Sequence, residues 1–329
     1  MRSNLLRLGF ALALLLPLAW LTATRGEAVA AVSKVRSYGG TVSLQLDGAS
    51  VGTVRSAAGG DVVGSVIEHR DGADLRAKKQ LGATAAEDIV LEVGLGLERS
   101  LYDWIAVSWT GKPARKSGAL VVLDANLQAR SAREFDNALI SETTFPALDG
   151  ASKEAGLLRV VLSPERVRTT TGSAAKSNVT SKSKAWLVSN FRLELDGLDC
   201  KRVAKIDSFT VKQTVATSAV GSARELSKEP GRLSFGDLKI TLAEAGGDSW
   251  RTWHDDFVVR GNNADKNEKS GRIVLLGPDL KEELAEIKLG NAGIYALRAT
   301  GGGGGGSSET IAQLEAELYV ERMELSIKR

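Results

Sequence analysis

The sequence is poor in the residues from which many active sites are built. Among its 329 residues it has one cysteine, Cys200, and two histidines, His69 and His254. One cysteine cannot form a disulfide within the chain, so the fold has to rest on its hydrophobic core. A metal site needs three or four converging ligands, and each histidine has only adjacent acids beside it, in EHRD (68–71) and WHDD (253–256). We interpret both histidines as solvated polar residues.

Signatures of catalysis and of nucleotide binding are missing as well. The chain has no Gly-x-Ser-x-Gly nucleophile elbow. The six glycines at 301–306 are not followed by the Gly-Lys-Ser/Thr of a phosphate-binding loop, and we interpret them as a loose loop between the last strands. Cys200 has no base near it in sequence and is interpreted as a small hydrophobic residue. We therefore expect no catalytic, metal or cofactor site, and no enzyme.

The first 30 residues differ in composition from the rest. Basic residues (Arg2, Arg7) precede an apolar run from about Leu8 to Leu21, and the segment ends in Ala-Val-Ala at Ala30. This order is typical of a secretory signal peptide. The alternative is an uncleaved membrane anchor, but the run is short beside the roughly 20 residues that a bilayer span needs. We predict a signal peptide over 1–30, cleavage after Ala30, and export to the periplasm or the exterior.

The net charge does not favour a nucleic-acid partner. Removing residues 1–30 takes away three arginines and one glutamate, which lowers the formal net charge from +3 to +1. A nearly neutral chain has no general attraction for nucleic acid.

Aromatic residues make up 5% of the sequence, while glycine occurs 35 times. This composition favours a β-rich, turn-rich fold over a helical bundle.

The mature chain divides into two similar halves. The segment 168–184 is rich in Ser, Thr and Lys and has no apolar period, so we interpret it as a flexible linker between domains at 37–167 and 185–329. A shift of 149 residues aligns 46–104 with 195–253, with 12 identities in 59 positions, against about 4 expected from average composition. Farther on, KSGALVVLD (116–124) aligns with KSGRIVLLG (269–277). We predict a tandem duplication.

Each half shows the same order of elements. Alternating apolar residues predict strands at 41–48, 61–69 and 88–95, and at 191–197, 205–213 and 237–244. Each third strand is followed by a short helix and three further strands. We predict a mainly β fold made of two tandem small antiparallel barrel or sandwich domains, each with one short α-helix. Trp104 and Trp253 occupy matching helix positions, and we interpret them as anchors that hold the helix on the sheet, rather than as stacking platforms for sugars or bases.

Several short motifs resemble contractile-phage tail-tube proteins. They are Arg70-Asp71-Gly72, the Lys79-x-x-Gly82 turn, the helix Leu101-Tyr102-Asp103-Trp104-Ile105, and the following RKSGALVVLDANLQARSAREFDNA. The resemblance covers about 38–167. The second half is similar in fewer positions, at Gly221, Lys228, Gly231 and Trp253.

The resemblance implies a small β-barrel or sandwich whose copies stack as hexameric rings into a hollow tube, a fold shared with type VI secretion tube proteins. It also implies a structural role without catalysis, and partners among other tube or baseplate-like proteins. If each chain supplies two units, three chains make a six-unit ring, and a 17-residue coil spanning about 20–25 Å is long enough to join neighbours. Unpaired sheet edges invite strand addition. The expected assembly contacts therefore lie on the two polar arms, at Arg70, Asp71, Gly72, Lys79 and Gly82 and at Gly221, Lys228 and Gly231.

An alternative function stays open. Tail tubes assemble in the cytoplasm, whereas this sequence carries an export signal. We favour a tube-type fold redeployed outside the inner membrane. The second hypothesis is a secreted monomeric two-domain β-module that binds a surface ligand or a partner protein, in which case an isolated half would bind that ligand.

Overall fold

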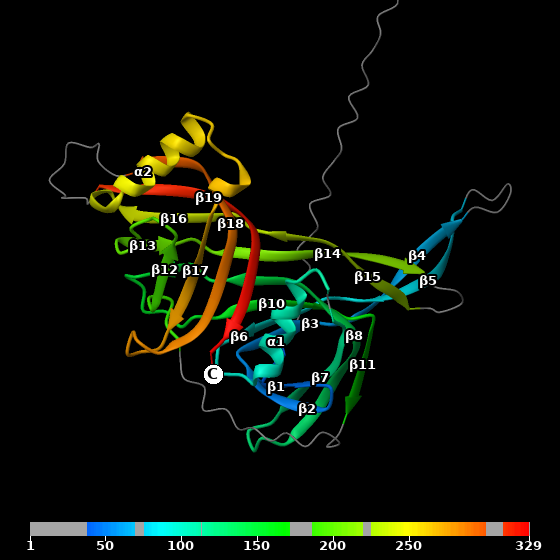
Figure 1. The fold of residues 1–329 in the computed structure, drawn as a ribbon. Coiled ribbons are helices and arrows are strands. Elements are labelled where there is room, and N and C mark those ends of the chain that lie inside the picture. The colour runs from blue at the N-terminus through cyan, green and yellow to red at the C-terminus, as the bar shows by residue number, and fades with distance from the viewer. Residues whose placement is uncertain are drawn as a thin grey trace, which may run out of the picture. The chain divides into compact units, whose positions relative to one another are not determined.

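Antiparallel strands formed by alternating sequences dominate the fold (Figure 1). The computed structural model describes residues 38–69, 76–112, 114–171, 186–219, 225–300 and 312–328. They form two large sheets, a separate two-stranded hairpin and a few short helices. The predicted mainly β class is confirmed. The predicted signal peptide and its cleavage site lie outside the described residues. Within the described residues, no helix is long and apolar enough to cross a bilayer.

The first sheet has ten strands, eight from the first half of the chain and two, β14 (Phe209–Ala219) and β15 (Leu226–Phe235), from the second. Its strands follow the order β2-β1-β7-β8-β10-β6-β3. Their bounds are β1 (Thr41–Leu46), β2 (Ala49–Val54), β3 (Ser56–Gly59), β6 (Ile89–Val93), β7 (Lys116–Leu123), β8 (Ala129–Phe145) and β10 (Leu158–Ser163). A further strand, β11 (Arg166–Thr171), pairs with β8. In β1 the alternating Val42, Leu44 and Leu46 are all buried, as expected for a strand with one face on the core.

The second sheet repeats this strand order. It runs β12-β17-β18-β19-β16-β13-β9. Its strands are β9 (Leu148–Asp149), β12 (Phe191–Leu195), β13 (Val203–Ile206), β16 (Leu238–Ala243), β17 (Lys269–Leu276), β18 (Glu283–Thr300) and β19 (Gln313–Ile327). Without β2 and β9, the six strands left in each of these two orders correspond one to one: β1 to β12, β7 to β17, β8 to β18, β10 to β19, β6 to β16 and β3 to β13.

The correspondence extends to register and irregularities. Leu46 lies opposite Gly118, and Leu195 lies opposite Gly271. The pairing of β7 with β8 slips just before Gly118, and the pairing of β17 with β18 slips just before Gly271. A second irregularity skips Ser141 in β8 and Tyr295 in β18. Residues 142–145 of β8 are therefore the counterpart of residues 296–299 of β18.

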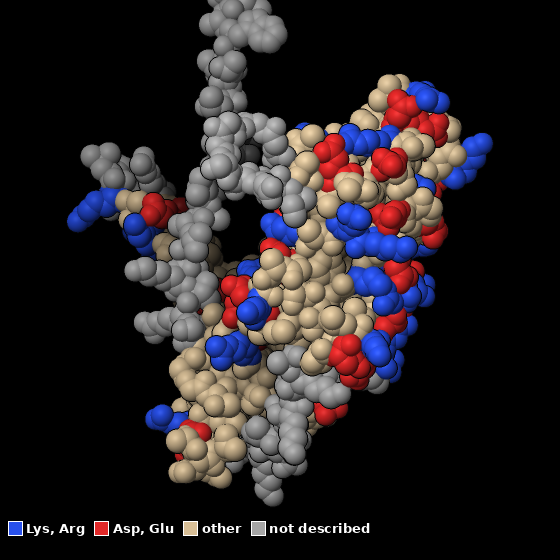
Figure 2. Space-filling view, turned by 90° about the vertical axis from the view of Figure 1, so that its left-hand side faces the viewer, with Lys and Arg blue, Asp and Glu red and all other residues tan. Residues whose placement is uncertain are grey.

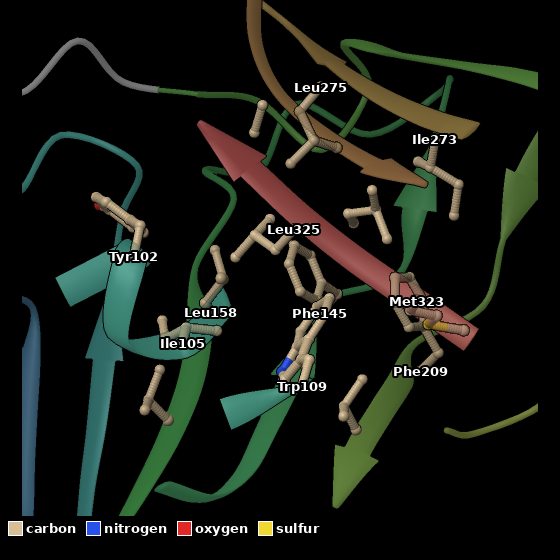
Figure 3. Close-up of a cluster of buried hydrophobic side chains, with 14 of the residues drawn as sticks. Tyr102, Ile105, Trp109, Phe145, Leu158, Phe209, Ile273, Leu275, Met323 and Leu325 are labelled. Carbon is tan, nitrogen blue, oxygen red and sulfur yellow. The ribbon is translucent and has the colours of Figure 1, made fainter. Parts of the chain in front are cut away.

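Helices and a shared core join the two halves. Helix α1 (Arg99–Ser108) lies against β8 of its own half and β19 of the other, and α2 (Asp248–His254) lies against β18. Figure 3 shows Tyr102, Ile105, Trp109, Phe145 and Leu158 packed against Phe209, Ile273, Leu275, Met323 and Leu325 from the other half. Residues 36–329 accordingly form one compact unit.

Two details differ from the sequence-based expectations. The single strand predicted at 205–213 is two strands, because Asp207 and Ser208 interrupt it: the Asp207 N–H donates to the Lys239 carbonyl, and the Ser208 hydroxyl donates to that of Phe145. The chain thereby crosses from the second sheet to the first. Residues 168–171, expected to begin the linker, belong to β11, because their three β-branched threonines suit a strand. The segment 172–185 lies outside the described residues.

Candidate functional site: the two hairpin arms

The first arm is a two-stranded hairpin that leaves its own sheet. It consists of β4 (Val62–His69) and β5 (Lys78–Ala86), which pair only with each other among the described strands. Five large apolar side chains on it are exposed, at fractions between 48% and 64%: Val62, Val63, Val66, Ile67 and Leu81. Two strands alone are marginal in water, and an apolar strand edge of this kind invites pairing with another chain.

The second arm repeats the first residue by residue. It consists of β14 (Phe209–Ala219) and β15 (Leu226–Phe235). Val62 pairs with Ala86 and Lys79 with Glu68; 149 residues later, Val211 pairs with Phe235 and Lys228 with Thr217. Both hairpins slip at the matching place, between Gly64 and Val66 and between Gln213 and Val215. The two arms thus share the register of their pairing and the position of its slip.

Only the second arm adds a strand to the edge of a large sheet; the first arm touches it through β5, where Thr84 bridges Glu225, and its β4 edge has no described strand partner besides β5. Strand β14 adds to the edge of β8 through Phe209 to Lys212, antiparallel to Glu142 to Phe145. Phe145 and Phe209 stack with ring centroids 5.1 Å apart, and both are labelled in Figure 3. Val211 is 2% exposed in this joint, whereas its counterpart Val62 is 57% exposed. We call this contact between β14 and β8 the internal joint.

A cluster of polar groups secures the β15 side of the internal joint. Lys228 is buried, and its ammonium group donates to the Ala86 carbonyl at 3.0 Å and to the Asp88 carboxylate at 3.2 Å. The Lys228 N–H donates to Glu165 at 2.9 Å, and Arg115 pairs with Glu165 at 2.8 Å. Burial acts to raise the pKa of Glu165, but hydrogen bonds from Lys228, Asn137 and Ser227 and the charge of Arg115 outweigh it and lower that pKa. The cluster is therefore held by an ionised Glu165.

The residues predicted as assembly contacts divide between the two arms. Lys79 is exposed and pairs with Glu68 at 2.7 Å, while its counterpart Lys228 is buried beside the internal joint. Gly82 and Gly231 each lie against a hydroxyl of the facing strand: a β-carbon at Gly82 would lie 2.6 Å from the Ser65 hydroxyl oxygen, and one at Gly231 would lie 2.3 Å from that of Thr214. The predicted contacts Arg70, Asp71, Gly72 and Gly221 lie outside the described residues.

Both tryptophans predicted as helix anchors are buried. Trp104 is 1% exposed and its indole N–H donates to the Ala114 carbonyl at 2.8 Å. Trp253 is 6% exposed and packs between Trp250 and Phe257, with the Lys269 ammonium group 5.3 Å from its ring centroid. Buried rings of this size stabilise the helix–sheet contact, and they leave no aromatic face open for stacking on a ligand.

A groove of about 890 Å³ lies along β12, whose outer edge has no counterpart of β2. Its lining carries both signs of charge: Arg192 and Arg272 each form an ion pair with Glu194. Figure 2 shows basic and acidic side chains interspersed over the face that it draws.

Cys200 also lines the groove, and burial raises the pKa of its thiol to about 11. A protonated thiol is a poor nucleophile. Within the described residues, no three His, Cys, Asp or Glu side chains cluster to hold a metal.

Comparison with known families gives one match. Residues 41–168 match the family described as T4-like virus tail tube protein gp19. This match confirms the resemblance to contractile-phage tail-tube proteins for the first half of the chain. No curated protein matches the chain.

Solved structures with a related outline come from contractile injection systems. One is an extracellular contractile injection system, the PVC sheath-tube complex in its extended state, at 19% identity over 43% of this chain and 95% of that one, with a TM-score of 0.37. Another is the tube-terminating cap of the anti-feeding prophage, at 23% identity over 44% of this chain and 99% of that one, with a TM-score of 0.36. Likeness at this level carries no further conclusion about the chain.

Sequence reasoning located the arms but missed what they contact. It noted the identity of Val62 with Val211 without predicting that one is buried and the other exposed, and it gave no role to Glu165 or to residues 142–145. The 17-residue β8 is longer than the 8-residue β7, so β7 covers only part of one side of β8 and leaves residues 142–145 open to β14.

Proposed function

We propose that this chain is a non-catalytic structural subunit of tube type, which self-assembles into rings, and that each chain supplies two tail-tube-like units. Three copies then complete a ring of six units. The carrying observation is the match of residues 41–168 to the tail-tube family, combined with the repetition of that half's strand order in the second sheet. A duplication of one tube-type unit accounts for the repeat, including the matching irregularities in β8 and β18.

The internal joint supports the ring as well. It joins two consecutive units edge to edge, by strand addition. Because the joint brings together two different surfaces, the edge of an arm and the edge of a sheet, it is a heterologous contact. If the same contact is repeated between successive units, the result is a ring when the rotation closes and a filament when it does not. The partners we propose are first of all other copies of this chain, and then further tube or baseplate-like proteins.

The compartment is part of the proposal. The predicted signal peptide places the mature protein, beginning at Ala31, in the periplasm or outside the cell. N-terminal sequencing of the protein recovered from cell fractions tests this directly. A mature N-terminus at Ala31 supports export, and an intact N-terminus in the cytoplasmic fraction overturns it.

The mass of residues 31–329 in solution tests the assembly. Light scattering at micromolar concentration is expected to give three times the chain mass or a multiple of it, and negative-stain images are expected to show rings or stacked rings. A stable monomer at that concentration overturns the ring and supports the second hypothesis, a secreted two-domain module that binds a partner.

A further inference from the structure

We propose that the free first arm of one copy pairs with the free end of β18 in the next copy, and so repeats the internal joint between molecules. The inference rests on the self-assembly proposed above and names the residues that perform it. The donor is the outer edge of β4, and the acceptor is residues 296–299 of β18. Each chain thereby carries one donor edge, on β4, and one acceptor edge, on β18, of the same kind of joint.

The first step of the argument is that a donor is left over. The two arms have one pairing register and one slip position, but only the second has an acceptor in its own chain. Val211, on the second arm, is 2% exposed. Val62, the valine at the corresponding position of the first arm, is 57% exposed. Further along β4, Val66 and Ile67 are 62% and 54% exposed.

The second step is that an acceptor is left over. Residues 142–145 of β8 have β10 on one side and β14 on the other. Their counterparts, residues 296–299 of β18, have β19 on one side, and no described strand pairs with the other. The loss of cover is visible in burial: Thr143 and Phe145 are fully buried, whereas Leu297 is half-buried and Ala299 is exposed.

The third step is that donor and acceptor are chemically matched. Transferring the register of the internal joint places Val62 opposite Leu297, and Asp61, which directly precedes β4, opposite Arg298. The first pair is apolar with apolar and the second is acidic with basic. Within one chain Asp61 pairs with Arg133 at 2.9 Å and Arg298 pairs with Glu317 at 2.6 Å, so both side chains exchange partners in the proposed joint. Cross-strand pairs of these kinds favour a register, while a slip by one residue would turn every side chain to the other face.

The polar cluster beside the internal joint also has a counterpart. Lys228 is held by Asp88 and Glu165. In the second half, Asp237, which directly precedes β16, and Glu321 on β19 occupy the matching positions, as the pairing of Leu238 with Leu318 and of Ile89 with Leu162 indicates. Asp237 now accepts a hydrogen bond from the Tyr295 hydroxyl at 3.1 Å. In the proposed joint, Lys79 of the incoming arm meets these two acids. Its present partner is Glu68, in an exposed ion pair of the kind that contributes little and exchanges readily.

Disulfide trapping between differently labelled chains tests the joint. In a Cys200→Ser background, one chain carries Val62→Cys and a second, distinguishable by an added tag, carries Leu297→Cys. After mixing and mild oxidation, the expected product is a covalent dimer of one chain of each kind. Each single variant alone is expected to stay monomeric under denaturing conditions. The matched control pair is Leu127→Cys with Leu280→Cys, two exposed counterpart positions away from the joint, which is expected not to form the mixed dimer.

The outcomes separate this inference from the function on which it rests. Assembly in solution together with the mixed Val62–Leu297 dimer supports both. Assembly of the unmodified chain without that dimer, or with equal trapping of the control pair, overturns the strand joint and leaves the ring. Monomers throughout overturn both. The double variant, with both cysteines in one chain, is expected to give a covalent ladder that ends at the number of chains in a closed ring.

Discussion

Glycines at two counterpart positions mark where the strands of each half approach most closely. Gly118 in β7 and Gly271 in β17 follow the same Lys-Ser pair, and each lies under a backbone carbonyl of the neighbouring strand. A β-carbon would lie 2.2 Å from the Gln45 carbonyl oxygen at Gly118, and 2.2 Å from that of Glu194 at Gly271. Because the obstructing atom is backbone, no side-chain rotation relieves the contact.

Alanine at either position is therefore expected to destabilise the fold. Gly118→Ala and Gly271→Ala should each lower the free energy of unfolding by about 1–3 kcal/mol, and by similar amounts because their surroundings match. Urea unfolding monitored by tryptophan fluorescence measures this. Gly39→Ala is the control, since nothing lies within 4 Å of its β-carbon position. Equal stability of all three variants would contradict the close approach.

At the scale of elements, the two arms provide a comparison within one molecule. Val62→Asp and Val211→Asp are the same change at the same hairpin position, one exposed and one buried. Val211→Asp places an unpaired carboxylate in the internal joint, and we expect it to cost more than about 3 kcal/mol of folding stability. Val62→Asp is expected to change the stability of the dissociated chain by no more than about 0.5 kcal/mol and to abolish assembly at micromolar concentration.

Thermal unfolding and light scattering on the two variants provide the readouts. A Val62→Asp chain that still assembles would contradict the role of the first arm. A Val211→Asp chain as stable as the unmodified protein would contradict the importance of the internal joint. Circular dichroism of both variants shows whether either effect comes from general misfolding.

The elements differ in how far the sequence predicts them. Alternation located β1, β6, β12 and β16 closely, because each has one face on the core and shows the period of two. It failed at 205–213, where two short strands belong to different sheets and a side-chain bond at Ser208 marks the crossing. It also failed at the linker boundary, since a polar threonine strand such as β11 carries no apolar period. The repeat predicted the arms, but burial of one arm depends on contacts between residues far apart in the chain.

At the scale of the whole molecule, carboxylates tie the halves and the second sheet together. Besides Glu165, the pKa of Glu194 is lowered by hydrogen bonds from Arg272, and that of Glu286 by a hydrogen bond from Lys328 and the charge of Arg272. A carboxyl whose pKa is lower when folded binds fewer protons in the folded than in the unfolded state at acid pH. Its contribution to stability is present above the ordinary value of about 4.5 and is lost as the pH falls through the folded value.

We therefore expect the urea midpoint to fall as the pH is lowered from 5 to 3. The triple variant Glu165→Gln, Glu194→Gln, Glu286→Gln is expected to be less stable than the unmodified chain at pH 7 and to show a shallower decline between pH 5 and 3. Unfolding curves at pH 7, 5, 4 and 3 measure both quantities. A triple variant whose stability declines as steeply as that of the unmodified chain would contradict the assignment.

The exchange of strands between halves makes the chain one folding unit. Strand β9 of the first half pairs with β13, and β14 of the second half pairs with β8. Phe145 and Leu148 are fully buried, and from the second half Phe209 stacks on Phe145 and Ile206 pairs with Leu148. Separating the halves exposes these side chains and leaves β14 without its acceptor. We expect the fragments 37–171 and 185–329 to lack a cooperative thermal transition when each is purified alone.

Mixing the two fragments is expected to restore the transition, because the internal joint and the shared core form again without the linker. Calorimetry of each fragment and of the equimolar mixture provides the measurement, with the unmodified chain as reference. Carrying Val211→Asp in the second fragment should block reconstitution, while carrying Val62→Asp in the first should not, since Val62 lies outside the joint between halves. A cooperative transition in either isolated fragment would show that the halves are separate domains, each stable through its own sheet, and that strand exchange adds contact without being required.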